Sequence, residues 1–236
     1  MAKGEGDDHH RGPRGEPVFL LPPLVTVLVG AMIVLVVLRS FLSPAADQDF
    51  VYAFGFVPDR YAAGGGWIDY PGGGGALAWT FLTYAFLHEG WAHLLINAAM
   101  LAALARPVLE RTGSARFLAF FVAVTVGGAL GHLAVAWGSE APMIGASGAV
   151  SGLLGALLRF VFRPGWLPAG GVVESLKEPR VRGVIAALVV MNVALVVFGT
   201  GLVGGVGGSV AWGAHLGGFL VGFLGFSWFE APRPRW

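Results

Sequence analysis

The chain has 236 residues, of which 56% are hydrophobic and only 12% charged, and its mean hydropathy is +0.71. Soluble domains usually carry about a quarter charged residues, so this composition excludes an ordinary soluble protein and favours a membrane protein. The formal net charge is +1, and no basic stripe is available to neutralise phosphates, which argues against nucleic acid as a partner. The absence of cysteine excludes disulfides, cysteine-ligated zinc and thiol nucleophiles.

The first seventeen residues are polar and mixed in charge. The apolar segment after them lacks a small-residue cleavage site, so we expect a cytoplasmic tail and not a signal peptide. His9 and His10 could bind a metal ion as a pair, but neighbouring histidines in a polar tail are more often inert.

Six stretches come near the roughly 20 apolar residues that a membrane-spanning helix needs. They are Val18–Leu38, Trp91–Leu109, Arg116–Trp137, Ser147–Phe162, Val184–Thr200 and Val210–Phe229. The longest connection, Arg39 to Gly90, is rich in glycine and aromatic residues, and its Trp67, Tyr70 and Trp79 suit a membrane interface. The sequence therefore predicts an all-α membrane protein, a bundle of six transmembrane helices with a long external loop between the first two.

The lysines and arginines predict the orientation, because short cytoplasmic loops carry the excess of both. Arg39 and Arg60 fall on one side of the predicted membrane. The other thirteen fall on the opposite side: Lys3, Arg11, Arg14, Arg106, Arg111, Arg116, Arg159, Arg163, Lys177, Arg180, Arg182, Arg233 and Arg235. We therefore expect both termini in the cytoplasm, and the second, fourth and sixth helices run from outside to inside.

Polar residues of the membrane region cluster near the beginnings of those three helices. His88, His93 and Asn97 open the second, Ser147 opens the fourth, and His215 lies early in the sixth. Ionisable residues within a membrane span are expensive and indicate function. Their shared depth near the outer face predicts one common site.

The sequence Gly145-Ala146-Ser147-Gly148 places a serine where a loop becomes a helix. The first amides of a helix lack intrahelical partners, so the Ser147 amide can stabilise an oxyanion. An ordinary serine N-cap remains the alternative. The fourth stretch has about 16 residues and reaches roughly 24 Å, less than the roughly 30 Å of hydrocarbon. We therefore expect Ser147 below the membrane surface, with Gly138–Gly145 dipping in to meet it.

His215 is the candidate general base. Gly218 and Gly222 follow it on the same helical face, and the fourth stretch offers Gly148, Gly152 and Gly155. Small residues at such spacing allow helices to approach closely, which would bring the imidazole within hydrogen-bonding reach of Ser147. A structural histidine in the core is the alternative.

His93 and Asn97 are four residues apart and share a helical face. Their side chains could supply donors to an oxyanion hole, and a polar pair that packs helices together is the alternative. His88 and His93 are five residues apart, whereas zinc-protease helices place their histidines four apart. We therefore expect no metal and no cofactor.

No carboxylate is obviously placed as a third catalytic member. Glu110 falls at the cytoplasmic end of the second stretch, and Glu140 falls in a loop. A Ser-His dyad is therefore the economical interpretation. We interpret His132, in the third stretch, as a core or pore-lining residue.

Taken together and in this order, these motifs resemble those of the rhomboid family of intramembrane serine proteases. The residues that carry the resemblance are His88, His93-x-x-x-Asn97, Glu110 before Gly113, Gly145-Ala146-Ser147-Gly148 and Ala214-His215-x-x-Gly218. The resemblance implies that Ser147 is the nucleophile and His215 the base. It also implies that His93, Asn97 and the Ser147 amide form the oxyanion hole, with His88, Gly145, Gly148 and Gly218 as further motif positions.

The resemblance also implies the substrates and the location. Substrates would be single-pass transmembrane proteins, cut near the outer membrane face, and the lipid bilayer is the other partner. The domains would be a cytoplasmic tail at 1–17, a six-helix rhomboid-like protease domain at 18–230 and a cytoplasmic C-terminal tail at 231–236. We expect a multi-pass integral membrane protein of a bacterial plasma (inner) membrane.

Two positions depart from the family pattern. Many relatives have a Trp-Arg pair in the first external loop, where this chain has Trp79-Thr80. One turn after the nucleophile, an aromatic residue often stacks on the catalytic histidine, and this chain has Ser151. Two other classes stay open at this point: a small channel or transporter, since histidines also line pores, and a non-catalytic rhomboid-like protein that binds membrane clients.

Overall fold

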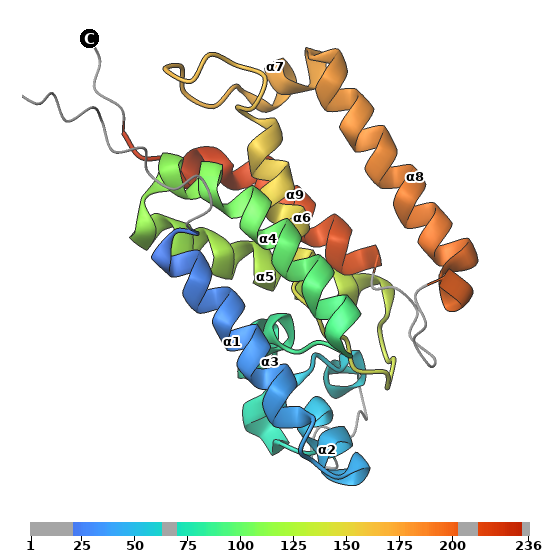
Figure 1. The fold of residues 1–236 in the computed structure, drawn as a ribbon. Helices are drawn as coiled ribbons and strands as arrows, with labels where there is room; N and C mark the ends of the chain where they lie inside the picture. Colours follow the sequence, from blue (N-terminus) through green and yellow to red (C-terminus); the bar gives the residue numbers. More distant parts are fainter. Residues whose placement is uncertain (1–20, 63–69, 203–211, 233–236) are drawn as a thin grey trace, which may run out of the picture.

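The computed structural model describes residues 21–62, 70–202 and 212–232, and it shows a helical protein (Figure 1). Within these ranges no β-strand forms, and the β-type pairing is an isolated antiparallel bridge between Phe56 and Met143. The all-α class predicted from the sequence is therefore confirmed for the described part of the chain.

Each of the six predicted stretches overlaps one helix. These helices are α1 (Pro23–Arg39), α4 (Trp91–Thr112), α5 (Ser114–Val135), α6 (Ser147–Leu158), α8 (Pro179–Leu202) and α9 (Trp212–Phe229). The predicted starts at Val18 and Val210 lie outside the described residues, as do His9, His10 and Trp67. Helix α6 has 12 residues, so it is even shorter than predicted and its axis spans only about 18 Å.

The connection between α1 and α4 contains helices that the sequence did not predict. They are α2 (Pro44–Phe54) and α3 (Ala76–Thr83), together with short 3-10 turns η1 (Pro58–Tyr61), η2 (Gly73–Gly75) and η3 (Tyr84–Phe86). Helix α2 starts with a serine cap, since the Ser43 hydroxyl accepts a hydrogen bond from the Ala46 amide at 3.3 Å. The Trp79 indole on α3 donates to the Ala53 carbonyl at 2.8 Å and so ties α3 to α2.

Helix α9 packs between α5 and α6, and glycines form both contacts. A Cβ added to Gly222 of α9 would lie 1.9 Å from the Gly152 carbonyl oxygen of α6, and one added to Gly217 would lie 2.2 Å from the Gly127 carbonyl oxygen of α5. Such backbone contact is possible only without side chains. The close approach predicted for the sixth and fourth stretches therefore occurs here as α9 against α6.

Buried arginines join the other end of the bundle, where α4, α6 and α9 finish. Arg111 of α4 pairs with Glu230 at 2.8 Å and donates to the Leu167 carbonyl at 3.0 Å. Arg159, just after α6, donates to the Gly170 carbonyl at 2.8 Å and to the Ser227 hydroxyl of α9 at 2.9 Å. Because buried charges need partners, these bonds fix the ends of the helices that carry the candidate site at their beginnings.

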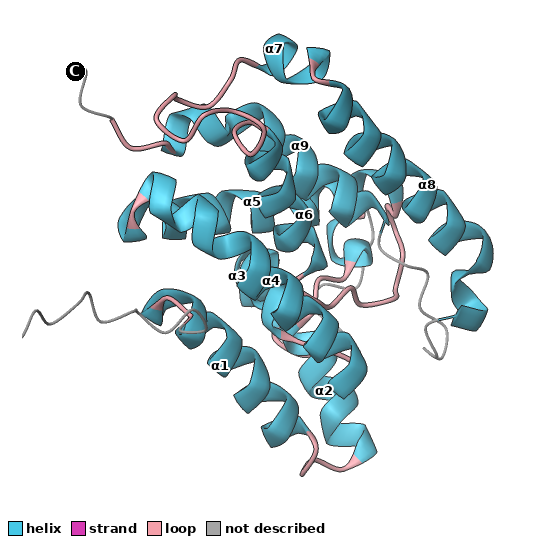
Figure 2. Cartoon of the chain, turned by 45° about the horizontal axis from the view of Figure 1, so that its top comes forward, coloured by secondary structure: helices cyan, strands magenta, loops and turns pink. Residues whose placement is uncertain are grey.

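Helices α1 and α8 lie on opposite sides of the bundle (Figure 1 and Figure 2). After α6 the chain forms the short helix α7 (Val172–Lys177) and then enters α8. The beginning of α8 packs on the bundle through Val181, Val184 and Ile185, which contact Leu158 and Phe223. Further along, apolar side chains such as Val189 and Val190 are exposed.

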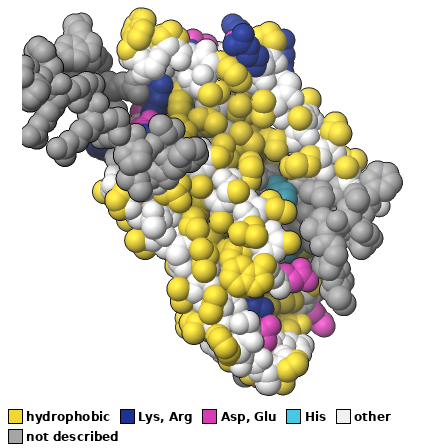
Figure 3. Space-filling view, viewed as in Figure 1, with side chains coloured by type: hydrophobic (Ala, Val, Ile, Leu, Met, Phe, Trp, Pro, Cys, Tyr) yellow, Lys and Arg dark blue, Asp and Glu magenta, His cyan; other side chains and the backbone are white. Residues whose placement is uncertain are grey.

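The surface is broadly apolar. Figure 3 shows hydrophobic side chains covering the middle of one face, with charged side chains toward its upper and lower ends. Among the described residues, α4 and α5 are long and apolar enough to cross a membrane by length and composition, and α1 and α6 are shorter apolar helices. An apolar flank of this kind suits lipid and not water.

Candidate functional site

Ser147 is the first residue of α6, and backbone hydrogen bonds to two other segments hold the loop before it. The backbone of Met143 pairs with Phe56, and the Gly145 amide donates to the Tyr84 carbonyl at 2.9 Å. Gly145 has a φ of +119°, a conformation that other residues rarely adopt. The serine therefore sits at a fixed helix start, where the first amides lack intrahelical acceptors.

His215 lies in the first turn of α9 and reaches Ser147. Its Nε2 atom is 2.9 Å from the Ser147 Oγ atom, although the two residues are 68 positions apart in the chain. Both side chains are half-buried. The glycine contacts between α6 and α9 make this approach possible. A serine hydroxyl beside an imidazole nitrogen is the arrangement of an activated nucleophile and its base.

Asn192 of α8 joins the site, and the sequence analysis missed it. Its Oδ1 atom lies 2.8 Å from the His215 Nδ1 atom, and its Nδ2 group donates to the Leu188 carbonyl at 2.8 Å. The available signal was a single amide side chain in an otherwise apolar stretch of α8. Asn192 carries a neutral amide, whereas the third member of a serine protease triad is typically a carboxylate, so its residue type did not mark it as a partner of His215.

His93 of α4 lies beside Gly145, just before the start of α6, and Asn97 follows His93 one turn later on the same helix. A Cβ added to Gly145 would lie 2.7 Å from the His93 Nε2 atom, so the imidazole packs directly against that glycine. Asn97 is buried, and its Nδ2 group donates to the His93 carbonyl at 2.9 Å. A carboxamide carries two N–H donors, so this bond uses one of them.

The buried His88 side chain packs against the His93 ring. It is 1% exposed, and the two rings meet edge-on with centroids 5.0 Å apart. The His88 backbone is held by Arg39 of α1, whose Nη1 group donates to the His88 carbonyl at 2.7 Å. The fourth histidine in this region, His132, is buried in α5 next to Gly213 of α9.

The two carboxylates considered from the sequence lie away from this cluster. Glu110 accepts a hydrogen bond from Arg106 at 3.0 Å on the exposed surface near the end of α4. Glu140 is exposed in the loop before α6. In the described part of the chain, no group of three His, Asp or Glu side chains is arranged to hold a metal ion.

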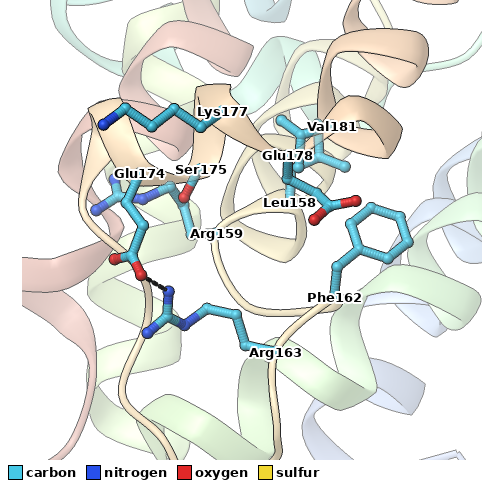
Figure 4. Close-up of a pocket in the computed structure, with 9 residues that line it drawn as sticks. All are labelled: Leu158, Arg159, Phe162, Arg163, Glu174, Ser175, Lys177, Glu178 and Val181. Atoms are coloured by element: carbon cyan, nitrogen blue, oxygen red, sulfur yellow. Dashed lines mark hydrogen bonds and ion pairs between the residues drawn. The ribbon is translucent and has the colours of Figure 1, made fainter.

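A cavity of about 290 Å³ lies at the opposite end of α6 (Figure 4). Its walls include the Arg163–Glu174 ion pair, together with Lys177, Glu178 and Val181. Because Ser147 begins α6 and Leu158 ends it, roughly the 18 Å length of the helix separates this cavity from the serine. The cavity is therefore distinct from the Ser147–His215 cluster.

Comparison with known proteins identifies similar chains. A family model described as the rhomboid domain matches residues 76–230. The chain is 26% identical to Rhomboid protease GluP of Bacillus subtilis over 212 residues, which are 90% of this chain and 36% of that protein. It is 30% identical to RHOMBOID-like protein 5 of Arabidopsis thaliana over 156 residues, which are 66% of this chain and 45% of that protein. The chain thus spans less than half the length of either relative.

Proposed function

Because the chain belongs to the rhomboid family, we propose that it is an intramembrane serine protease in which Ser147 and His215 form the catalytic dyad. The observation that carries the proposal is the 2.9 Å contact between the His215 Nε2 atom and the Ser147 Oγ atom. The 26% identity to a protein named as a rhomboid protease supports the same activity.

In the proposed reaction the His215 Nε2 atom takes the proton of the Ser147 hydroxyl while the Oγ atom attacks the carbonyl carbon of the scissile peptide bond. The imidazolium then donates that proton to the leaving amine, and the peptide C–N bond breaks. Water, deprotonated by the same nitrogen, hydrolyses the resulting ester on Ser147. Each proton therefore passes through one atom of His215, and Ser147 returns to its starting state.

We propose that the oxyanion hole consists of the Ser147 amide, His93 and Asn97. The amide lies at the start of α6, where the helix dipole favours negative charge. His93 packs against Gly145, two residues before the nucleophile. Asn97 keeps one N–H donor beyond its bond to the His93 carbonyl. These groups come from two helices, α4 and α6, so the hole needs their close packing.

We further propose that α1, α4, α5, α6, α8 and α9 cross the membrane, with the long connection between α1 and α4 on the external side. The split of lysine and arginine, thirteen on one side and two on the other, supports cytoplasmic termini and a bacterial inner-membrane orientation. The site then lies near the outer face, and α6 is too short to reach that surface. Single-pass transmembrane proteins cut near their outer ends are the proposed substrates.

The proposal is tested by cleavage of a single-pass transmembrane substrate in liposomes that contain the purified full chain. We expect cleavage by the wild type and by Ser151→Ala, a control one turn further along α6. Ser147→Ala and His215→Ala should each reduce cleavage to background, and the double variant should be no worse, because the two residues act as one unit.

Metal chelators should leave this cleavage unchanged, since the proposed reaction uses only protein groups and water. Loss of cleavage in chelator, with recovery on adding zinc, would contradict the serine mechanism. A chain that binds the substrate without cutting it would support the non-catalytic alternative instead. Ion or solute flux without cleavage would support the channel or transporter.

A further inference from the structure

The side of His215 that faces away from Ser147 is hydrogen-bonded to another helix. Its Nδ1 atom lies 2.8 Å from the Asn192 Oδ1 atom of α8. We propose that Asn192 is a positioning residue, which fixes the tautomer and the ring orientation of His215 and thereby completes a Ser147–His215–Asn192 chain. This inference rests on the proposed function of Ser147 and His215.

The hydrogen-bond chain determines which atom carries each proton. The Leu188 carbonyl can only accept, so the Asn192 Nδ2 group must face it, and the Oδ1 atom must face His215. An amide oxygen can only accept, so the His215 Nδ1 atom must carry the hydrogen. In a neutral imidazole the other nitrogen is then an acceptor. The Nε2 atom is therefore free to take the Ser147 proton, as a general base requires.

Asn192 lies on the face of α8 that is directed toward the bundle. It is half-buried, whereas Met191 and Val193 on either side are 47% and 56% exposed. A helix that faced only lipid would gain nothing from an amide side chain here, because a polar group in an apolar setting is costly. Back-bonding to Leu188 would satisfy one N–H group, but it does not explain the contact between the Asn192 oxygen and His215.

The packing of α8 against the bundle positions Asn192 for its contact with His215. The start of α8 is anchored by Val181, Val184 and Ile185 against Leu158 and Phe223, and Asn192 lies about two helical turns beyond that anchor. Oriented catalytic bases depend on such a second partner, because the wrong tautomer or ring rotation leaves no acceptor at the nucleophile. A neutral amide should contribute less than the aspartate of a classical triad.

Three variants test the proposal in the full chain, with a fluorophosphonate probe that labels the activated serine. In Asn192→Leu the acceptor is lost at similar volume, and the labelling rate should fall about tenfold, the effect of one neutral hydrogen bond. In Asn192→Asp an acceptor remains. The control Val193→Ala changes an exposed neighbour on α8 and should label at the wild-type rate.

The pH dependence supplies a readout that a purely structural residue would not change. A carboxylate at position 192 stabilises the charged imidazolium, so half-maximal labelling of Asn192→Asp should move to higher pH by about one unit or more. His93 of α4 is a titratable neighbour of His215 among the described residues, and it is unchanged in every variant. An unshifted profile in Asn192→Asp would overturn the proposal.

The tautomer can be read directly from ¹⁵N NMR of the histidine ring in the wild type and in Ser147→Ala. Both should show the hydrogen of His215 on Nδ1, and Asn192→Leu should show a mixture of tautomers. A hydrogen on Nε2 in the wild type would overturn the proposal even if Asn192→Leu does not fold. Labelling of Asn192→Leu at the wild-type rate would overturn it as well. If the wild type is not labelled at all, the proposed protease function fails instead, and the NMR result still decides the role of Asn192.

Discussion

Gly218 of α9 lies so close to Gly148 of α6 that a Cβ added to Gly218 would be 2.0 Å from the Gly148 carbonyl oxygen. Gly148 directly follows the proposed nucleophile, and Gly218 lies about one turn after the proposed base. The 2.9 Å distance between the His215 Nε2 atom and the Ser147 Oγ atom therefore depends on the absence of a side chain at position 218.

Replacing Gly218 tests this dependence. In Gly218→Ala the new methyl group meets a backbone oxygen, so α6 and α9 must separate, and overpacking of this kind typically costs about 1–3 kcal/mol. We expect proteolysis to be lost and the temperature of unfolding to fall. Cleavage assays and thermal unfolding in detergent measure the two effects.

Gly225→Ala is the matched control on the same helix. Its added Cβ would lie 3.5 Å from the Trp228 ring, an ordinary contact, and alanine is the better helix former. This variant should keep wild-type activity and stability. Equal activity in Gly218→Ala and Gly225→Ala would show that the close approach at position 218 is not needed.

The proposed orientation in the membrane predicts which introduced thiols are accessible. Gly90 lies at the start of α4, on the proposed outer side, and Gly165 lies after α6, on the proposed inner side; an added Cβ meets nothing within 4 Å at either position. The chain has no cysteine of its own. In intact cells an impermeant maleimide should label Gly90→Cys and spare Gly165→Cys, and the reverse pattern would contradict the proposed topology.

Much of the fold follows from apolar stretches of sufficient length. Such stretches predict helices well, because in lipid the backbone must satisfy its own hydrogen bonds. Helices α2 and α3 were not predicted, because they are short and do not lie in a long apolar stretch. Their residues lie in a segment whose glycines indicate loops, and α3 is held by a tertiary contact, the bond from the Trp79 indole to the Ala53 carbonyl.

Some residues of the candidate site could likewise be predicted from the sequence, and one could not. Ser147, His215 and the glycines around them are visible in sequence because each is chemically unusual within an apolar stretch. Asn192 is equally unusual, but its partner is revealed only by the packing of α8 against the bundle, which places Oδ1 2.8 Å from the His215 Nδ1 atom. The family resemblance places Ser151 where an aromatic residue often stacks on the catalytic histidine, and the sequence could not reveal that a residue of another helix contacts His215 instead.

The proposed oxyanion hole predicts a graded effect for Asn97→Ala. Removing one of three donors typically costs a factor of about 10²–10³ in turnover, and less where His93 and the Ser147 amide compensate. Labelling of Ser147 by a fluorophosphonate should persist at a lower rate, because the nucleophile and base remain. Steady-state cleavage and labelling rates measure both quantities.

Ile96→Ala is the control for this prediction, since Ile96 precedes Asn97 on α4 and its side chain is 62% exposed. It should leave both rates unchanged. If Asn97→Ala abolished labelling while His215→Ala did not, the roles of base and oxyanion donor would be assigned wrongly.

The most direct test of the central claim is the site of covalent modification by a fluorophosphonate, mapped by mass spectrometry of the peptides of the membrane-embedded protein. The account predicts one modified residue, Ser147, with modification abolished in Ser147→Ala, reduced to background in His215→Ala and unchanged in Ser151→Ala. Modification that persists in Ser147→Ala, or that proceeds at the wild-type rate in His215→Ala, would contradict it.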